Sequence, residues 1–477
     1  MKPSIPKGTR DFLPAEVRRR DYIFDVIRKH FRRFGYQPIE TPVMENLATL
    51  TGKYGEEGDK LLFKVLNNGD FLKKANADDL TNKDSGKVLS SISKRGLRYD
   101  LTVPFARYVV MHQNDLAFPF KRYAIMPVWR ADRPQKGRYQ EFYQCDADVV
   151  GSDSLLNEAE LTQLLDGVFH ELGLKAVIRL NNRKILAGLA EIAGMADNMM
   201  DMTITIDKLD KIGWEKVAEE LGNRGADAGA IDVVKQFLDA NSLESVAPLL
   251  ANSEIGKQGI AELQEVFDLV ALHSPLSGGE GPGERRTNNR IEFDVTLARG
   301  LNYYTGAIWE VAVDTDAPGQ ENIKMGSIAG GGRYADLTAI FGMKDMPGVG
   351  ISFGAERIYD VLEELDAFPA DASEDLQYLI LCLDKEILTH GFGLVSRLRA
   401  RGIHADLYPK STKLNKMMKY ADQRGVPEVI IIGSQEMASG NYTVKDMKTG
   451  HQRNMMERQF NPLPEFIWLA KEYGADK

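Results

Sequence analysis

The segment from residue 120 to residue 151 constrains the fold of this chain more than any other part of it. Its pattern predicts two strands, at 120–130 and 139–150, joined by a charged loop at 131–138. Alternate residues of a strand point to opposite faces, and one face of the second strand is apolar and expected to be buried. The other face carries Gln140, Phe142, Gln144, Asp146 and Asp148. This second face is expected to be wet or occupied by a ligand.

The loop between the two strands is rich in cations, and the order of its residues is informative. Arg130 ends the first strand, three more cations follow in the loop beside Asp132, and Phe142 comes on the return strand. A solvated surface hairpin is the simpler interpretation. Guanidinium groups, however, match the geometry of phosphate, and an aromatic face suits a purine. This order therefore favours a nucleoside triphosphate as the ligand.

The bulk composition limits the class of protein. The chain of 477 residues is long enough for two or three domains, and its net charge of −9 argues against a general nucleic-acid coat. Local patches can still bind RNA. Cys145 and Cys382 show no CxxC spacing, so we expect reduced thiols, a cytoplasmic location and no zinc site. The N-terminus has no apolar core of a secretion signal, and no apolar run is long enough for a membrane span.

The N-terminal part of the chain shows one clear helix. Residues 15–34 have the apolar spacing of an amphipathic helix that ends at Gly35. The segment 36–45 is extended and carries two prolines, which predicts an edge strand. A short strand is expected at 61–66, and the polar stretch 67–94 is expected to be a mobile insertion.

Three further segments carry polar or glycine residues whose pattern alone indicates an ordinary structural role. Asp100 and Thr102 precede a helix and on this basis cap it. Arg299 lies in a turn between two strands, at 298–306, where a lone arginine is usually a surface residue. The glycine-rich segment 326–337 supplies flexible backbone, either as a plain loop or as a cradle for substrate.

The segment after the glycines indicates another element near a ligand. A strand is predicted at 347–353 and a helix at 354–365, with Arg357 in the first turn of that helix and away from its apolar stripe. The chain has no P-loop sequence, so its phosphate site must be of another kind.

Two larger regions complete the pattern. Residues 182–290 predict an inserted helical module and a linker, whereas 376–456 alternates strands and helices, which predicts a small α/β domain with a mixed sheet. A helix at 413–424 in that domain is expected to expose its lysines. The side chains that it is expected to bury are those of Leu414, Met417, Met418 and Ala421. An extension with modest helical character follows at 457–477.

Several of these segments together resemble the histidyl-tRNA synthetase family of class II aminoacyl-tRNA synthetases. The hairpin carries RPQKGRY followed by FYQCD, which is similar to motif 2 of that class. KGTRDFLP with GYQPIETPVME resembles the N-terminal signature and motif 1, and GVGISFGAERI resembles motif 3. LRYDLTVPFARY resembles the amino-acid-binding loop, and ARGLNYYTG resembles a segment specific to the histidine enzymes. VPEVIIIG resembles the class IIa anticodon-binding domain.

The resemblance implies an α/β (α+β) fold. It consists of a catalytic core with an antiparallel sheet flanked by helices, a helical insertion, and a C-terminal mixed-sheet anticodon-binding domain. The implied divisions are the first part of the core at 1–181, the insertion and linker at 182–290, the second part of the core at 291–368, the anticodon-binding domain at 376–456 and a C-terminal extension at 457–477. Motif 1 builds the dimer interface in the family, so a homodimer is also implied.

The resemblance further implies ATP-dependent ligation of L-histidine to tRNA(His) through a histidyl-adenylate, with release of AMP and pyrophosphate. Magnesium is expected to accompany ATP, without a dedicated metal site in the protein, and Arg130 and Arg299 are the implied catalytic residues. The residues implied to bind histidine are Asp100, Thr102, Arg130, Gln144, Asp148, Arg299, Tyr303 and Tyr304. Those implied to bind ATP are Arg130, Asp132, Arg138, Phe142 and Arg357.

Two other interpretations were weighed against this one. A histidine-sensing paralogue, of the kind that serves as a regulatory subunit of ATP phosphoribosyltransferase, would lack the C-terminal domain and lose motif residues. This chain keeps Arg130, Arg299 and Arg357. Another class IIa synthetase would share the fold, but ARGLNYYTG argues against it. Asn302 and the Ala335–Asp336 pair depart from the family pattern, so no role is assigned to them.

Overall fold

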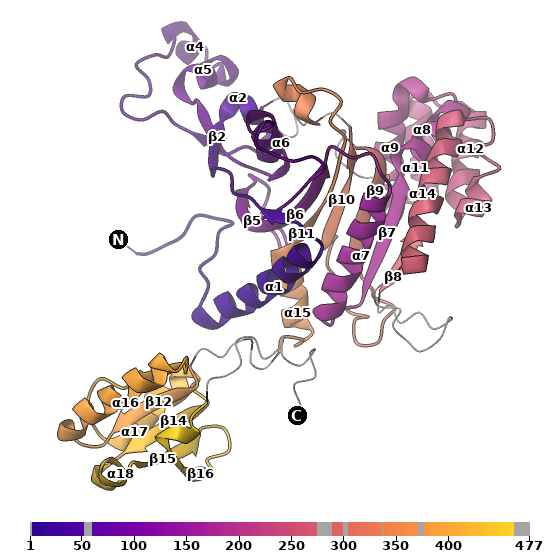
Figure 1. The fold of residues 1–477 in the computed structure, drawn as a ribbon. Helices are drawn as coiled ribbons and strands as arrows, with labels where there is room; N and C mark the ends of the chain where they lie inside the picture. Colours follow the sequence, from indigo (N-terminus) through magenta and orange to yellow (C-terminus); the bar gives the residue numbers. More distant parts are fainter. Residues whose placement is uncertain are drawn as a thin grey trace. The chain divides into compact units, whose positions relative to one another are not determined.

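The computed structural model describes residues 2–51, 60–273, 289–298, 304–335, 337–369, 372 and 376–461, without the side chains of residues 210 and 273. The chain forms two compact units. The first comprises Met1–Asp11 and Arg20–Ala367, and the second comprises Phe12–Arg19 and Phe368–Lys477. Figure 1 traces both units along the chain.

Among the described residues, an eight-stranded sheet forms the centre of the first unit (Figure 1). In spatial order its strands are β1 (Gln37–Pro38), β5 (Phe120–Trp129), β6 (Glu141–Val150), β11 (Gly348–Gly354), β10 (Ala329–Tyr334), β9 (Tyr304–Val313), β7 (Ala176–Asn182) and β8 (Arg290–Phe293). The strands from β5 to β7 are antiparallel to one another, which confirms the predicted antiparallel sheet. β1 and β8 pair in parallel at the two edges, and β1 is the predicted edge strand.

β5 and β6 are the two strands of the predicted hairpin. The first ends one residue earlier and the second begins two residues later than expected, so the charged loop is slightly longer. Arg122 of β5 lies directly opposite Asp148 of β6. On the apolar face Cys145, Ala147 and Val149 are fully buried, as their alternation predicts.

Helices cover the two faces of the sheet differently. α1 (Pro14–Arg33) and α7 (Leu156–Glu171) lie on the apolar face, where Phe31 and Phe169 have ring centroids 6.0 Å and 5.7 Å from that of Phe353 in β11. α6 (Thr102–Met111) lies on the other face, where Phe105 packs 6.4 Å from Phe120 between ring centroids. The polar face of β6 therefore faces the same side as α6, and the described site residues gather there.

A small antiparallel sheet precedes α6 in the chain. It consists of β2 (Met44–Asn46), β4 (Arg95–Leu97) and β3 (Lys64–Val65), the last shorter than the predicted strand. The stretch predicted to be a mobile insertion contains α4 (Ala77–Thr81) and α5 (Ser85–Ile92), together with other turns. Asn76 and Asp84 accept backbone hydrogen bonds at the starts of these helices, which explains how so polar a segment becomes helical.

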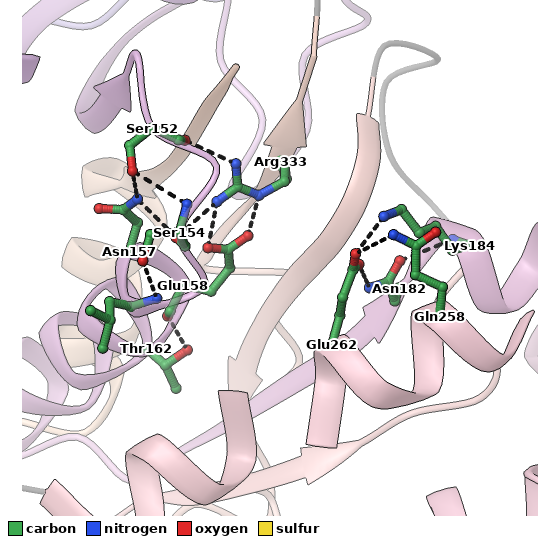
Figure 2. A network of polar contacts seen from close by, with 11 residues as sticks. Ser152, Ser154, Asn157, Glu158, Thr162, Asn182, Lys184, Gln258, Glu262 and Arg333 are labelled. Atoms are coloured by element: carbon green, nitrogen blue, oxygen red, sulfur yellow. Dashed lines mark hydrogen bonds and ion pairs between the residues drawn. The ribbon is translucent and has the colours of Figure 1, made fainter. Parts of the chain in front are cut away.

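The segment predicted to be a helical insertion is helical as far as residue 273. Its helices are α8 (Arg183–Ile192), α9 (Met199–Ile206), α10 (Leu209–Ile212), α11 (Trp214–Asn223), α12 (Ala228–Asp239), α13 (Leu243–Val246) and α14 (Glu254–His273). Glu262 of α14 accepts hydrogen bonds from Asn182, Lys184 and Gln258, as the right half of Figure 2 shows. These contacts hold α14 against the start of α8.

The second unit is the predicted α/β domain with a mixed sheet. Its strand order is β13 (Ala405–Leu407), β12 (Tyr378–Cys382), β14 (Glu428–Ile432), β15 (Asn441–Asp446) and β16 (Gln452–Met456). The first three strands are parallel and the last three are antiparallel. α16 (Leu388–Ala400), α17 (Leu414–Arg424) and α18 (Ser434–Ser439) accompany this sheet.

Details of this unit differ from the sequence-based expectation. α17 buries Met417 and Ala421, but Leu414 is 38% exposed, because it is the first residue of the helix and precedes the buried stripe. β16 and α18 are absent from the prediction. Phe460 is fully buried in the core of this unit, so the packed region continues past residue 456, where the sequence-based division ended it.

Candidate active site

The glycine-rich segment is a strand, β10, and not the loop that the sequence suggested. The absent side chains leave room for functional ones. A Cβ atom at Gly332 would lie 2.6 Å from the ring of Tyr304, and one at Gly350 of β11 would lie 2.0 Å from Oδ1 of Asp148. Glycine is therefore required here for close side-chain approach, which outweighs its low strand propensity.

A cavity of about 230 Å³ lies along the charged loop and the polar face of β6. Its lining includes six residues that the resemblance assigns to substrates, namely Arg130, Asp132, Arg138, Phe142, Gln144 and Arg357. Ser327–Gly330, Ser352, Gly354 and Glu356 line it as well. Residues distant in sequence thus meet here because β6, β11 and β10 are neighbours in the sheet.

Three arginines give this cavity a local excess of positive charge. Nε of Arg130 donates to the carbonyl of Tyr99 at 2.8 Å, and its guanidinium lies 5.2 Å from the ring centroid of Phe142. Arg357 donates to the carbonyls of Gly137 and Ser327. Burial, together with the neighbouring Arg138 and Arg130, lowers the pKa of Arg357 from its ordinary value. The crowding of like charges indicates an anionic ligand.

An acidic pair on α15 (Ala355–Glu364) holds the hairpin and its loop in place. Glu356 pairs with Arg20 of α1 at 2.8 Å and accepts a hydrogen bond from the backbone N–H of Tyr143 at 3.0 Å. Asp360 accepts from the hydroxyl of Tyr139 at 2.9 Å. These contacts are not apparent from the sequence, because they join elements more than 200 residues apart.

A second, smaller cavity of about 30 Å³ adjoins the first, and Gly330 and Ser352 line both. It brings together Thr102, Asp148 and Tyr304, three residues implied to bind histidine. The other residues of its lining are Asp146, Gly330, Gly331, Tyr334, Gly350, Ile351 and Ser352. The site therefore pairs a larger cavity lined by cations with a smaller one lined by carboxylates and tyrosines.

Asp148 is held by two residues that sequence reasoning missed. Nη2 of Arg122 lies 2.6 Å from Oδ2 of Asp148, and the hydroxyl of Tyr334 donates to Oδ1 at 2.9 Å. The same Nη2 lies 3.8 Å from Oδ2 of Asp146, and the Arg122 guanidinium stacks 4.4 Å from the ring centroid of Phe105. An arginine inside a predicted strand, opposite an acidic strand, is the signal that would have pointed to this pair.

Arg333, the residue before Tyr334, anchors this part of β10 on the opposite face (Figure 2). It lies where the pairing of β10 with β9 shifts register. Its guanidinium forms a forked pair with Glu158 of α7 and donates to the carbonyls of Ser152 and Ser154. Because Glu158 is fully buried, this anchor holds the backbone that directs Tyr334 towards Asp148.

Burial governs the protonation of the two neighbouring carboxyl groups. It raises the pKa of Asp146 to about 7, with Arg122 opposing the shift and Asp148 and Asp100 adding to it. Burial likewise raises the pKa of Asp148, which Arg122 and Tyr334 oppose. One guanidinium therefore serves two buried carboxyl groups, and Asp148 is the closer of the two.

Comparison with known proteins agrees with this geometry. Residues 8–358 match the histidyl-tRNA synthetase family, and residues 377–461 match the anticodon binding domain. The chain belongs to the histidyl-tRNA synthetase family. It is 54% identical to a histidine–tRNA ligase of Christiangramia forsetii over 97% of this chain and 98% of the relative, and 50% identical to one of Phocaeicola vulgatus over 94% and 96%. The crystal structure of histidyl-tRNA synthetase from Nostoc sp. PCC 7120 is 29% identical, covers 96% of this chain and 97% of its own, and superposes with a TM-score of 0.79.

Membership of the histidyl-tRNA synthetase family confirms the resemblance and the fold class predicted from the sequence. It also confirms the class of enzyme, an aminoacyl-tRNA synthetase that charges tRNA with histidine. Near-full-length similarity to ligases, together with the anticodon binding domain, favours this function over the sensor paralogue and over a synthetase for another amino acid.

The remaining histidine-site residues predicted from the synthetase motifs have different outcomes. Asp100 is buried and its Oδ1 accepts from the backbone N–H of Val103 at 3.2 Å, so it satisfies an N–H in the first turn of α6, although Leu101 is the residue that directly precedes the helix. α6 begins at Thr102, which also lines the smaller cavity. Arg299 and Tyr303 lie outside the described residues.

The part of the chain that the structure describes shows neither a cluster of metal ligands nor a helix able to cross a membrane. There, no three His, Cys, Asp or Glu side chains converge in a way that could hold a metal ion. None of the helices in these ranges combines the length and apolar character of a membrane span.

Proposed function

We propose that this synthetase activates L-histidine in the two adjoining cavities and transfers it to tRNA(His). In the first step the carboxylate of histidine attacks the α-phosphorus of ATP, pyrophosphate leaves, and a histidyl-adenylate forms. In the second step the terminal ribose hydroxyl of the tRNA attacks the acyl-adenylate and AMP leaves. The observation that carries this proposal is the junction of a cation-lined cavity with a carboxylate-lined one through Gly330 and Ser352.

Arg130 is proposed to stabilise the charge that develops at the α-phosphorus. It lines the larger cavity, and its hydrogen bond to the Tyr99 carbonyl fixes its guanidinium before substrate arrives. Preorganised donors of this kind are effective because they need no rearrangement in the transition state. Arg299 is proposed, on the resemblance of ARGLNYYTG alone, to act on the same reacting centre.

The adenine of ATP is proposed to lie between Phe142 and Arg357, because both line the same cavity and an aromatic ring and a guanidinium can sandwich a purine. Asp132 and Arg138, whose charged atoms are 3.9 Å apart, are proposed to meet the β- and γ-phosphates.

Magnesium is compatible with the donors in this cavity. It usually binds through one or two carboxylates together with substrate phosphates and water. Asp132 and Glu356 are the acidic residues of the cavity lining, and Asp132 is the better candidate because Glu356 already pairs with Arg20 and Tyr143. Bound there with ATP, the ion would neutralise phosphate charge.

The imidazole of histidine is proposed to meet Asp148 at one ring nitrogen and Tyr304 at the other, with Tyr303 beside them. Asp148 and Tyr304 line the same cavity. Gln144, with Asp100 and Thr102, is proposed to bind the α-amino or carboxylate end of the substrate. A site built to pair a hydrogen-bonding group rejects analogues that lack it by about 10⁴–10⁵. No editing domain is then required.

The C-terminal unit is proposed to bind the anticodon of tRNA(His). The divisions at 1–181, 182–290 and 291–368 are kept as functional parts of the chain, and the fourth, predicted at 376–456, is extended to include the buried Phe460. A homodimer is proposed as the working form, since β1 is a sheet edge and Val43 and Met44 beyond it are 41% and 46% exposed. A cytoplasmic location is proposed because both cysteines are free thiols.

ATP–pyrophosphate exchange with each amino acid in turn tests the first step. Exchange that depends on histidine alone is the expected result, and charging of tRNA(His) is then the test of the second step. Histidine binding without exchange would favour a sensor instead. Exchange with a different amino acid would overturn the assignment of the smaller cavity.

A further inference from the structure

Asp146 is a buried acid in the substrate site to which the resemblance assigns no role. It lies on β6 between Gln144 and Asp148, on the same face as both. Its side chain is 2% exposed and lines the smaller cavity together with Thr102. Within the described residues, its Oδ1 is buried and has no hydrogen-bond partner.

An unpartnered carboxylate oxygen in such a place indicates a missing donor. Buried polar atoms are nearly always hydrogen-bonded, and leaving one unpaired costs stability. Arg122 does not supply the donor, because its Nη2 lies 3.8 Å from Oδ2 of Asp146 and is engaged at 2.6 Å by Asp148. A ligand that enters the cavity can supply a proton donor to Oδ1, in addition to the hydroxyl of Ser352, whose hydrogen bond to Asp146 opposes the rise of its pKa.

The charges around the cavity indicate that this ligand is a cation. Two buried carboxyl groups, those of Asp146 and Asp148, share the buried guanidinium of Arg122, and the buried Asp100 adds to the rise in the pKa of Asp146. The hydroxyl of Tyr334 adds a neutral donor to Asp148 only. A positively charged donor would favour the ionised forms of Asp146 and Asp148, whose pKa values burial raises, and would satisfy Oδ1 of Asp146 at the same time.

The spacing along β6 distinguishes the two ends of a bound histidine. Alternate residues of a strand are about 7 Å apart and point to the same face, so the carboxyl groups of Asp146 and Asp148 can contact different ends of one amino acid. Asp148 is already proposed for the ring, and Thr102, proposed for the end that carries the α-amino and carboxylate groups, lines the cavity with Asp146. We propose that Oδ1 of Asp146 accepts a hydrogen bond from the α-ammonium of L-histidine and helps to determine specificity. This inference rests on the proposed function, in which histidine occupies the smaller cavity.

Calorimetry with two ligands tests the role of Asp146. L-Histidine carries the α-ammonium, whereas imidazolepropionate keeps the ring and the carboxylate but lacks the nitrogen. Asp146→Asn should weaken histidine binding about 10- to 100-fold, the range expected for a hydrogen bond to a charged group. Its affinity for imidazolepropionate should change little, because that ligand has no ammonium to lose.

A matched control is available elsewhere in the first unit. Asp166 of α7 is also 2% exposed, and it accepts a hydrogen bond from Asn289 at 2.7 Å away from both cavities. Asp166→Asn should leave the affinities for both ligands unchanged. Thermal unfolding establishes that each variant is folded. If Asp146→Asn does not fold, Asp146→Ser replaces it and is expected to show the same selectivity between the two ligands.

The outcomes separate this inference from the function on which it rests. Equal losses of affinity for both ligands, or no loss for histidine, would overturn the role of Asp146 while leaving the enzyme a histidine synthetase. If the wild-type chain bound no histidine and catalysed no histidine-dependent exchange, the proposed function itself would be wrong.

Discussion

Nη2 of Arg122 lies 2.6 Å from Oδ2 of Asp148, and the two side chains are 0% and 5% exposed. The pair spans neighbouring strands at positions directly opposite each other, so the backbone register of the hairpin sets its geometry. Arg122 does not line either cavity, whereas Asp148 lines the smaller one. Arg122 is therefore placed to orient Asp148 from the side away from the cavity. Loss of this ion pair is expected to affect both folding and substrate recognition.

Replacing Arg122 with methionine should destabilise the first unit by about 3–5 kcal/mol, because it leaves a buried carboxylate without its partner. The same change removes the interaction that opposes the raised pKa of Asp148, so histidine affinity should fall most strongly below neutral pH. Urea unfolding and calorimetry measure the two effects. Arg179→Met, which removes half-exposed ion pairs with Glu292 and Asp294, should cost no more than about 1 kcal/mol. Equal costs for both variants would contradict this account of Arg122.

Arg130→Ala should slow histidine-dependent pyrophosphate exchange by about 10²–10³-fold or more, as expected for the loss of a preorganised transition-state donor. Arg299→Ala should have an effect of similar size. Arg133 lies in the same loop, is exposed and does not line the cavity, so Arg133→Ala should exchange nearly as fast as wild type. Wild-type turnover in either of the first two variants would remove that residue from the mechanism.

Gly350→Ala should disturb the histidine site, because the added Cβ would lie 2.0 Å from Oδ1 of Asp148. Overpacking of this kind costs about 1–3 kcal/mol, and displacement of Asp148 should also raise the KM for histidine. Steady-state exchange kinetics and thermal unfolding report the two effects. Gly222→Ala, in α11 with its nearest neighbour 3.8 Å away, should be neutral or slightly stabilising. An unchanged KM in Gly350→Ala would show that Asp148 does not depend on this close approach.

The pKa of Asp146, raised from 3.8 to about 7, makes stability depend on pH. Between those values the folded chain keeps a proton that the unfolded chain has released. The contribution of this group to the free energy of unfolding therefore decreases as pH rises from about 4 to about 7, and levels off above that. Wild type should lose stability relative to Asp146→Asn over this range, as measured by urea unfolding at several pH values. Parallel pH profiles for the two proteins would rule out a raised pKa at Asp146.

The exposed lysines of α17 provide a test of tRNA binding. Lys416 and Lys419 project from the helix on the side away from its buried residues. Reversing both charges, with Lys416→Glu and Lys419→Glu, should raise the KM for tRNA in charging while leaving pyrophosphate exchange unchanged, since phosphate contacts dominate RNA affinity. Lys448→Glu, in the turn between β15 and β16, serves as a control that reverses one exposed charge elsewhere in this unit. Normal charging by the double variant would place the tRNA contact on another face of this unit.

Local sequence patterns were sufficient for much of the fold. The helix α1 follows from apolar residues at helical spacing, and the hairpin of β5 and β6 follows from alternation on either side of a charged loop. Six residues of the larger cavity were predicted from the resemblance to long family motifs and not from periodicity, and the other residues of its lining were not predicted. Such information lies within a few neighbouring residues, and the sequence by itself determined these features.

Tertiary structure decided what depends on pairing between distant segments. Gly330–Gly332 form a strand because β9 and β11 supply backbone hydrogen bonds on either side. The missing side chain of Gly332 leaves the space that the ring of Tyr304 occupies. The partnership of Arg122 with Asp148 depends on strand register, and the burial of Asp146 depends on the pairing of β6 with β5 on one side and β11 on the other. The physical reason is that burial and charge pairing are set by which surfaces meet, and one-dimensional periodicity does not contain that information.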